Sequence, residues 1–97
     1  MLKVIKVIPY TDYTIEIHYS NKEIKMFDMK PLFKYEIYKP LINKNLFYTV
    51  KPFYNTITWD NDIDIAPETL YEDSVKKNNK VKIQKVKKES NKRDIQY

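Results

Sequence analysis

Alternating apolar and polar residues predict three strands in the first third of the chain. Val4–Ile8 is a β-branched run that stops at Pro9. Over Tyr13–Tyr19 the apolar residues occupy every second position, as in a strand with one buried face. Ile24–Phe27 follows a short polar segment in which Asn21 is best suited to the left-handed conformation of a hairpin turn. We therefore expect an antiparallel meander.

The middle of the chain predicts a short helix and a second hairpin. Asp28 precedes residues 29–33, and its carboxylate can accept backbone N–H bonds from the first turn of a helix there. Residues 34–45 show no sustained period, so irregular structure with one further helical turn is expected. Leu46–Val50 is then a predicted strand, and Thr56–Trp59 is its predicted partner after a turn.

A second helix is predicted near residue 70. Pro67 suits the first helical position, where its missing N–H costs nothing, and Glu68 favours the positive end of the helix dipole. Tyr71 would pack inward, with Val75 one turn later. The expected fold is α+β, with about five mostly antiparallel strands and two short helices. The side chains expected to hold it together are Trp59, Pro67 and Leu70.

Charge divides the chain into two parts. Residues 1–75 carry nine lysines against eleven carboxylates, a balance of −2, whereas residues 76–97 carry nine cations against two carboxylates, a balance of +7. High charge with few apolar residues is typical of a segment without a core. We expect a compact domain over 1–75 and a basic, flexible tail over 76–97.

Catalytic and metal-binding chemistry finds little support. Cysteine and glycine are absent, which excludes thiolate metal sites and glycine-rich phosphate loops. Asp60, Asp62 and Asp64 resemble the start of a calcium loop, but such a loop needs Gly and Glu where Ile65 and Tyr71 stand. The only histidine is expected to be exposed on a strand. We therefore expect no enzyme, no metal and no cofactor.

Two surfaces are candidates for contact with other molecules. A protein partner is expected to bind an acidic stretch that also holds a tyrosine: Asp60, Asp62, Asp64, Glu68, Tyr71 and Glu72. Nucleic acid would bind the cations of the tail through phosphate contacts: Lys76, Lys77, Lys80, Lys82, Lys85, Lys87, Lys88, Lys92 and Arg93.

Two stretches carry a resemblance to a known family. They are Phe27–Leu32 and, more specifically, the run from Ile57-Thr58-Trp59 through Asp64-Ile65-Ala66-Pro67-Glu68-Thr69-Leu70-Tyr71. Together they resemble the small bacterial domain-of-unknown-function family twenty-four forty-two, over about residues 1–75. The resemblance implies a compact α+β domain without known catalytic residues. It also implies a role like that of an antitoxin, since such domains are sometimes encoded beside small toxin-like proteins.

The leading hypothesis is a non-enzymatic binding protein that neutralises or regulates another protein, in the manner of an antitoxin. One alternative is a nucleic-acid-associated protein that uses the basic tail. Another is an inhibitor of a host nuclease, of the anti-CRISPR kind, encoded by a phage or mobile element and presenting its acids as a mimic of nucleic acid. No run approaches the length of a membrane span, so a cytoplasmic location is expected.

Overall fold

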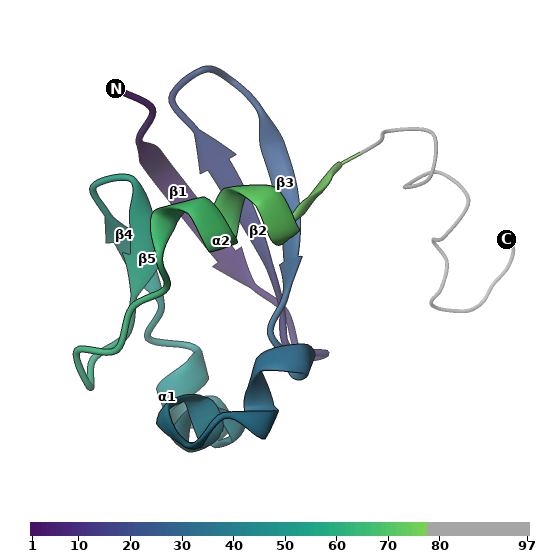
Figure 1. Cartoon of the computed structure of the whole chain (residues 1–97), viewed down its shortest axis with the longest axis vertical. Helices are drawn as coiled ribbons and strands as arrows, with labels where there is room; N and C mark the ends of the chain where they lie inside the picture. Colours follow the sequence, from purple (N-terminus) through teal and green to yellow (C-terminus); the bar gives the residue numbers. More distant parts are fainter. Residues whose placement is uncertain (78–97) are drawn as a thin grey trace, which may run out of the picture.

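The structure, a computed structural model, describes residues 1–77 and confirms the N-terminal meander (Figure 1). β1 (Val4–Pro9), β2 (Thr14–Tyr19) and β3 (Ile24–Asp28) pair antiparallel in that order. Alternation sets the faces, because Ile15 and Ile17 are fully buried on the inner face. The register shifts between Val4 and Lys6, a bulge at which Ile5 is 62% exposed.

The turns of this glycine-free chain use four other residues at positive φ: Tyr13 (68°), Lys22 (75°), Tyr54 (55°) and Asp62 (66°). The prediction that Asn21 takes the left-handed position is therefore wrong. Its side-chain carbonyl instead accepts the Glu23 backbone N–H at 2.9 Å. This local bond fixes Asn21 at the start of the turn and moves the left-handed conformation to Lys22.

Residues 30–47 form three short helices, where we expected one short helix, irregular chain with one further helical turn, and the start of a strand. They are the 3₁₀ helices η1 (Lys30–Lys34) and η2 (Glu36–Ile42) and the helix α1 (Lys44–Phe47). The predicted helical turn after Asp28 is confirmed, and the Asp28 carboxylate accepts the Lys30 backbone N–H at 3.0 Å. The strand predicted over Leu46–Val50 is wrong, because Asn43 caps α1 by accepting the Asn45 N–H at 2.9 Å.

The partner of β5 (Thr56–Thr58) is therefore β4 (Lys51–Phe53), which follows the expected strand. Pro52 has no N–H to donate, which is tolerated in a strand at the edge of this two-stranded sheet. The helix α2 (Pro67–Asp73) begins at the predicted proline, without a side-chain cap from Ala66.

α2 does not extend to Val75 as predicted. The chain leaves the helix at Ser74, and β6 (Val75–Lys76) pairs antiparallel with β3 to complete the sheet order β1-β2-β3-β6. Val75 is accordingly 70% exposed. The α+β class with mostly antiparallel strands is confirmed.

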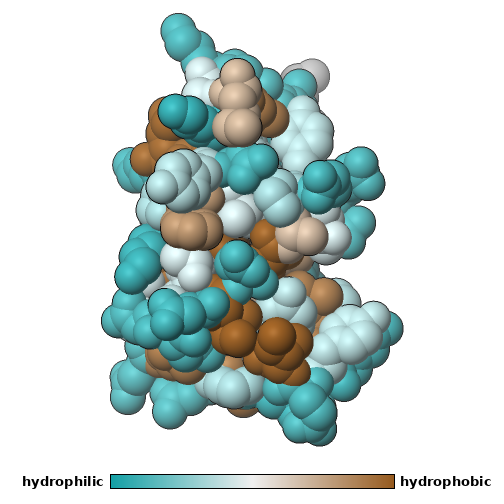
Figure 2. Space-filling view, turned by 60° about the vertical axis from the view of Figure 1, so that its left-hand side comes forward, coloured by the Kyte–Doolittle hydropathy of each residue, from teal (hydrophilic) through white to brown (hydrophobic). Residues whose placement is uncertain are grey.

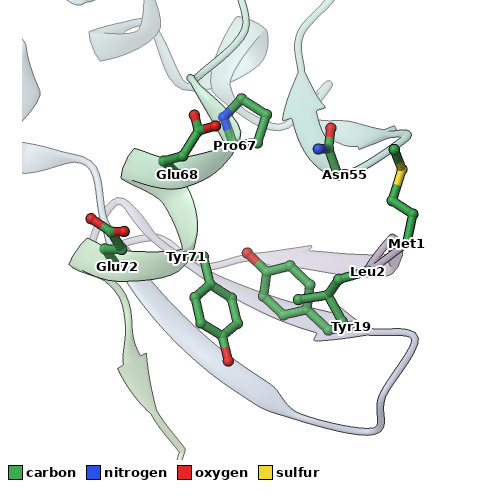
Figure 3. Close-up of a pocket in the computed structure, with 8 residues that line it drawn as sticks. All are labelled: Met1, Leu2, Tyr19, Asn55, Pro67, Glu68, Tyr71 and Glu72. Carbon is green, nitrogen blue, oxygen red and sulfur yellow. The ribbon is translucent and has the colours of Figure 1, made fainter.

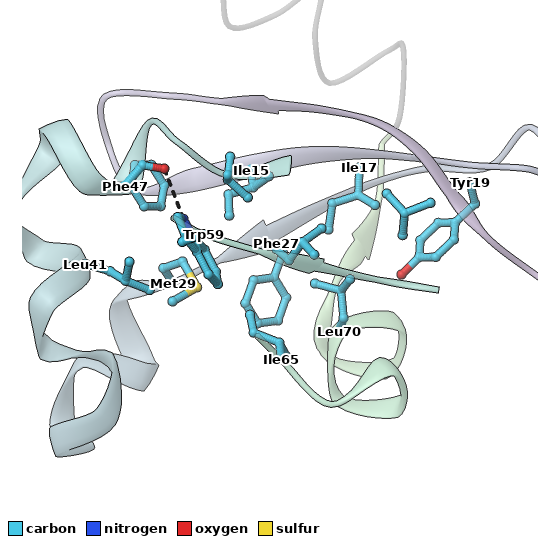
Figure 4. Close-up of a cluster of buried hydrophobic side chains, with 13 residues drawn as sticks. Ile15, Ile17, Tyr19, Phe27, Met29, Leu41, Phe47, Trp59, Ile65 and Leu70 are labelled. Atoms are coloured by element: carbon cyan, nitrogen blue, oxygen red, sulfur yellow. Dashed lines mark hydrogen bonds between the residues drawn. The ribbon is translucent and has the colours of Figure 1, made fainter. Parts of the chain in front are cut away.

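One core joins the two sheets and α2 (Figure 4). Trp59 is fully buried, and its indole N–H donates to the Phe47 carbonyl at 3.0 Å, which ties the end of β5 to α1. Leu70 fastens α2 over the inner face of the sheet, where Figure 4 shows it beside Phe27. The structural roles expected of Trp59 and Leu70 agree with their burial, since each such side chain contributes about 1.5–3 kcal/mol.

Thr56 and Thr58 are buried as well, although alternation would place them in water. Their hydroxyls donate to the carbonyls of Ile65 and Ile63 in the loop before α2. Because that loop covers β5, all three side chains of β5 are buried. Outside the core, Figure 2 shows a mainly hydrophilic face with hydrophobic residues between, some of which adjoin one another in the lower half of the view. No helix within residues 1–77 is long and apolar enough to cross a membrane.

Candidate partner-binding site

An open pocket lies between α2 and the N-terminal end of the sheet, with a volume of about 270 Å³ (Figure 3). We call it the α2 pocket. Four chain segments line it, through Met1 and Leu2 before β1, Tyr19 at the end of β2, Asn55 in the β4–β5 turn, and Pro67, Glu68, Tyr71 and Glu72 of α2.

Local structure brings these segments together. The backbone N–H of Val4 donates to the Tyr54 carbonyl at 2.8 Å, which holds the β4–β5 turn beside the N-terminus. Residues one helical turn apart share a face, so Glu68 and Glu72 lie on the same side of α2 and Pro67 is above Tyr71. The pocket is thus built from the N-terminal chain, the end of β2, one turn and one helix.

Two tyrosines form its aromatic wall. The Tyr19 and Tyr71 rings meet edge to face, with 5.2 Å between centroids and 76° between planes. The Tyr71 hydroxyl donates to the Glu23 carboxylate, which holds the ring in place. Lys25 stands 3.6 Å from the centroid of the Tyr71 ring and donates to the Tyr71 carbonyl at 2.6 Å. This contact satisfies the buried ammonium at the negative end of α2.

The Tyr19 hydroxyl has no such partner. Tyr19 is 1% exposed, and its hydroxyl is the one buried side-chain polar atom in residues 1–77 without a hydrogen bond. Figure 3 shows the hydroxyl directed from the ring toward α2 rather than toward the hairpin. Burial, with smaller contributions from Tyr71 and Glu23, raises the pKa of Tyr19 to about 12, so the phenol stays neutral. A buried polar group without a partner costs about 1–3 kcal/mol, so this atom needs an explanation.

The structure brings three of the six expected partner-binding residues into the α2 pocket, namely Glu68, Tyr71 and Glu72. The others lie in the β5–α2 loop. Asp60 pairs with Lys51 at 3.1 Å, Asp62 takes a positive φ, and Asp64 bridges to Thr58 in a loop closed by backbone bonds. The three aspartates do not converge on a point, and no group of three metal-ligating side chains occurs within residues 1–77.

A second cluster of charged groups surrounds Glu16 on the opposite face of the sheet. This glutamate was expected on a solvated face, but it is 5% exposed. Its carboxylate accepts the Tyr10 hydroxyl at 2.8 Å, the Lys77 ammonium at 2.7 Å and His18 Nε2 at 2.7 Å. Burial alone would raise its pKa, yet bonds from Lys77, Tyr10 and His18 lower the pKa of Glu16 to about 2.

The Glu16 cluster corrects one prediction and shows where two of the tail cations lie. His18 is half-buried and hydrogen-bonded, not a freely exposed strand histidine. Since the carboxylate can only accept, His18 Nε2 carries the hydrogen. Two of the expected phosphate contacts lie within the described residues: Lys77 pairs with Glu16, and Lys76 lies in β6 with its ammonium 4.0 Å from Glu23. The other expected nucleic-acid contacts lie outside the described residues: Lys80, Lys82, Lys85, Lys87, Lys88, Lys92 and Arg93.

Sequence reasoning missed Tyr19, Met1, Leu2 and Asn55 as site residues. Tyr19 has the same position in the alternating pattern as Ile15 and Ile17, so its sequence signal is that of a core residue. The position of α2 in the fold, which the sequence does not give, is what places Tyr19 beside a pocket. No sequence pattern marks Met1 or Asn55 as a site residue. They reach the pocket because the β4–β5 hairpin lies beside β1 in the folded chain.

Comparison with known proteins gives one match. No curated protein and no solved structure matches the chain significantly. The profile of a family described as "Protein of unknown function (DUF2442)" matches residues 4–76, from the first residue of β1 to the last of β6. This range contains both sheets, α2 and the Glu16 cluster apart from Lys77. The chain therefore belongs to the DUF2442 family, as its sequence resemblance indicated.

Proposed function

We propose that this protein is a non-enzymatic binding module that neutralises or regulates a partner protein, in the manner of an antitoxin, and that the α2 pocket is its contact surface. The observation that carries the proposal is the composition of this pocket. It combines acidic side chains, two tyrosines and an unpartnered hydroxyl. Tyrosine is enriched at the energetic centres of protein interfaces.

Exposed apolar groups beside the pocket support the same proposal. Met1 is 92% exposed, and Tyr54, in the turn next to Asn55, is 71% exposed while its ring packs 4.9 Å from that of Phe53. Large apolar side chains in water around a concave site are typical of protein interaction surfaces. The pocket volume of about 270 Å³ lies below the roughly 300–1,000 Å³ usual for small-molecule sites.

The two alternatives gain less from the structure. For the nucleic-acid alternative, Lys77 is one of the nine proposed phosphate contacts, and its ammonium lies 2.7 Å from Glu16. The nuclease-inhibitor alternative shares Glu68 and Glu72 with the present proposal, and it becomes a special case if the partner is a nuclease.

The experiment is co-purification from the native host with the affinity tag at the C-terminus, because Met1 lines the pocket. The double variant Glu68→Lys/Glu72→Lys reverses the acidic side of α2, and Glu36→Lys, an exposed glutamate in η2, is the matched control. We expect the wild type and Glu36→Lys to retain the same partner and to restore growth when that partner is overproduced. The double variant should lose both. Equal retention and rescue by the double variant would show that the surface is wrong.

A further inference from the structure

The Tyr19 hydroxyl is the most unusual polar atom of the described chain, and it suggests what the α2 pocket binds. Buried hydroxyls nearly always find a hydrogen-bond partner. Tyr19 belongs to the core and also lines the α2 pocket, and Figure 3 shows its buried hydroxyl directed toward α2. Its neutral state leaves an oxygen with free acceptor capacity.

The charges around the pocket favour a cationic ligand. Glu68 and Glu72 belong to its lining, and neither makes an ion pair within 4.0 Å in the part of the chain that the structure describes. Two lysines of the adjoining strands are already engaged: Lys25 with the Tyr71 carbonyl and ring, and Lys76 with Glu23. Among the described residues, the lining contains no lysine or arginine.

Apart from Asn55 and Tyr71, the remaining lining is apolar. Met1, Leu2 and Pro67 offer carbon surface on either side of the opening in Figure 3. Long basic side chains bury a methylene stem against such surface while the charged head reaches polar groups. A volume of about 270 Å³ is too small for a nucleotide and suits one side chain.

We propose that the α2 pocket receives a basic side chain of the partner protein, with arginine preferred, through Glu68, Glu72 and the Tyr19 hydroxyl. This inference rests on the proposed function above. Arginine is preferred over lysine because its guanidinium is weakly hydrated and carries five donors in a planar fork. One N–H group of the guanidinium would donate to the phenol oxygen of Tyr19, and the remaining N–H groups would donate to the carboxylates of Glu68 and Glu72.

The test uses blocked tripeptides as probes against the purified full chain: Ala-Arg-Ala, Ala-Lys-Ala and Ala-citrulline-Ala, the last being a neutral isostere of the first. Binding is followed by two-dimensional amide NMR. We expect the arginine peptide to shift amides of α2 and the end of β2, and the citrulline peptide to bind at least about tenfold more weakly, since a hydrogen bond to a charged group contributes about 1.5–3 kcal/mol.

Three variants locate the contact. Tyr19→Phe removes only the unpartnered hydroxyl, so it should fold normally and bind the arginine peptide about tenfold more weakly. Glu68→Gln/Glu72→Gln should weaken binding by about fivefold, the range for exposed pairs. Glu36→Gln should change nothing. Equal affinity for arginine and citrulline peptides, or an unchanged affinity in a folded Tyr19→Phe, would overturn the proposal.

The failure of this inference differs from the failure of the proposed function. If the partner is captured and lost on reversal of Glu68 and Glu72, but the peptides show no preference for charge, the binding module stands and the basic ligand is wrong. If the arginine peptide binds as expected but no protein partner depends on α2, the pocket chemistry stands and the regulatory role is wrong.

Discussion

Replacing Glu16 with glutamine tests the interpretation of the cluster on the outer face of the sheet. The substitution keeps the shape of the side chain and removes its charge, leaving Lys77 beside a buried neutral group. The carboxyl has a pKa of about 2 in the folded protein, against 4.5 for an unperturbed glutamate. Each pKa unit corresponds to about 1.4 kcal/mol, so ionised Glu16 stabilises the fold by about 3 kcal/mol near neutral pH.

The sign follows from the direction of the shift. Because the folded-state pKa lies below the unfolded-state value, this stabilisation is fully present above about pH 4.5 and is lost as the pH falls toward about 2. Glu16→Gln should therefore lower the free energy of unfolding by about 3 kcal/mol at neutral pH. The matching fall in Tm is about 12–24 °C for a domain of this size. The gap between wild type and variant should close as the pH approaches 2.

Urea unfolding followed by far-UV circular dichroism, at neutral pH and at two acidic values, measures this gap. Lys77→Met and the double variant complete a double-mutant cycle. The two single losses should not add, because the Nζ–Oε1 contact of 2.7 Å couples the two residues. A Glu16→Gln protein within 0.5 kcal/mol of wild type at neutral pH, a threshold of about the additivity error, would refute this account.

Three further predictions concern the core and the turns. Trp59→Phe should cost about 2–4 kcal/mol, since it removes the indole hydrogen bond to the Phe47 carbonyl and opens a cavity; urea unfolding by circular dichroism measures it. Trp59 is the only tryptophan and is fully buried, so the fluorescence of the folded protein should resist quenching by iodide. Quenching as strong as in the urea-unfolded chain would show that Trp59 is not buried in the core. Lys22→Gly should raise Tm by relieving a positive φ of 75°, with a gain of up to about 1 kcal/mol, whereas Asn21→Gly should destabilise by removing the bond to Glu23.

The sequence was most informative where alternation and burial coincide. β1, β2 and β3 are hydrogen-bonded neighbours in sequence, so local patterning was sufficient to predict them. Pro67 likewise marked the start of α2. The family match covers the same region and confirms the resemblance seen around Trp59 and Leu70.

The errors arose where tertiary contacts outweigh propensity. The apolar, β-prone run Leu46–Val50 folds as a helix and turn because Asn43 caps it and the Phe47 carbonyl receives the Trp59 indole. Val75 left the predicted helix because the exposed edge of β3 offered backbone partners. Of the eight residues that line the α2 pocket, only Glu68, Tyr71 and Glu72 were among the expected contacts, because they share one segment while Tyr19 and Met1 come from separate segments.

The ion pair between Lys77 and Glu16 also determines how the domain responds to mechanical load. A pull transmitted from the chain after Lys77 reaches β6 first, and only two residue pairs join that strand to β3. The β1–β2–β3 meander is joined by longer ladders and should hold at forces that detach β6. Rupture of a two-residue strand and one buried carboxylate contact would then precede global unfolding, so a single-molecule stretching trace should show a small early extension that Glu16→Gln shifts to lower force.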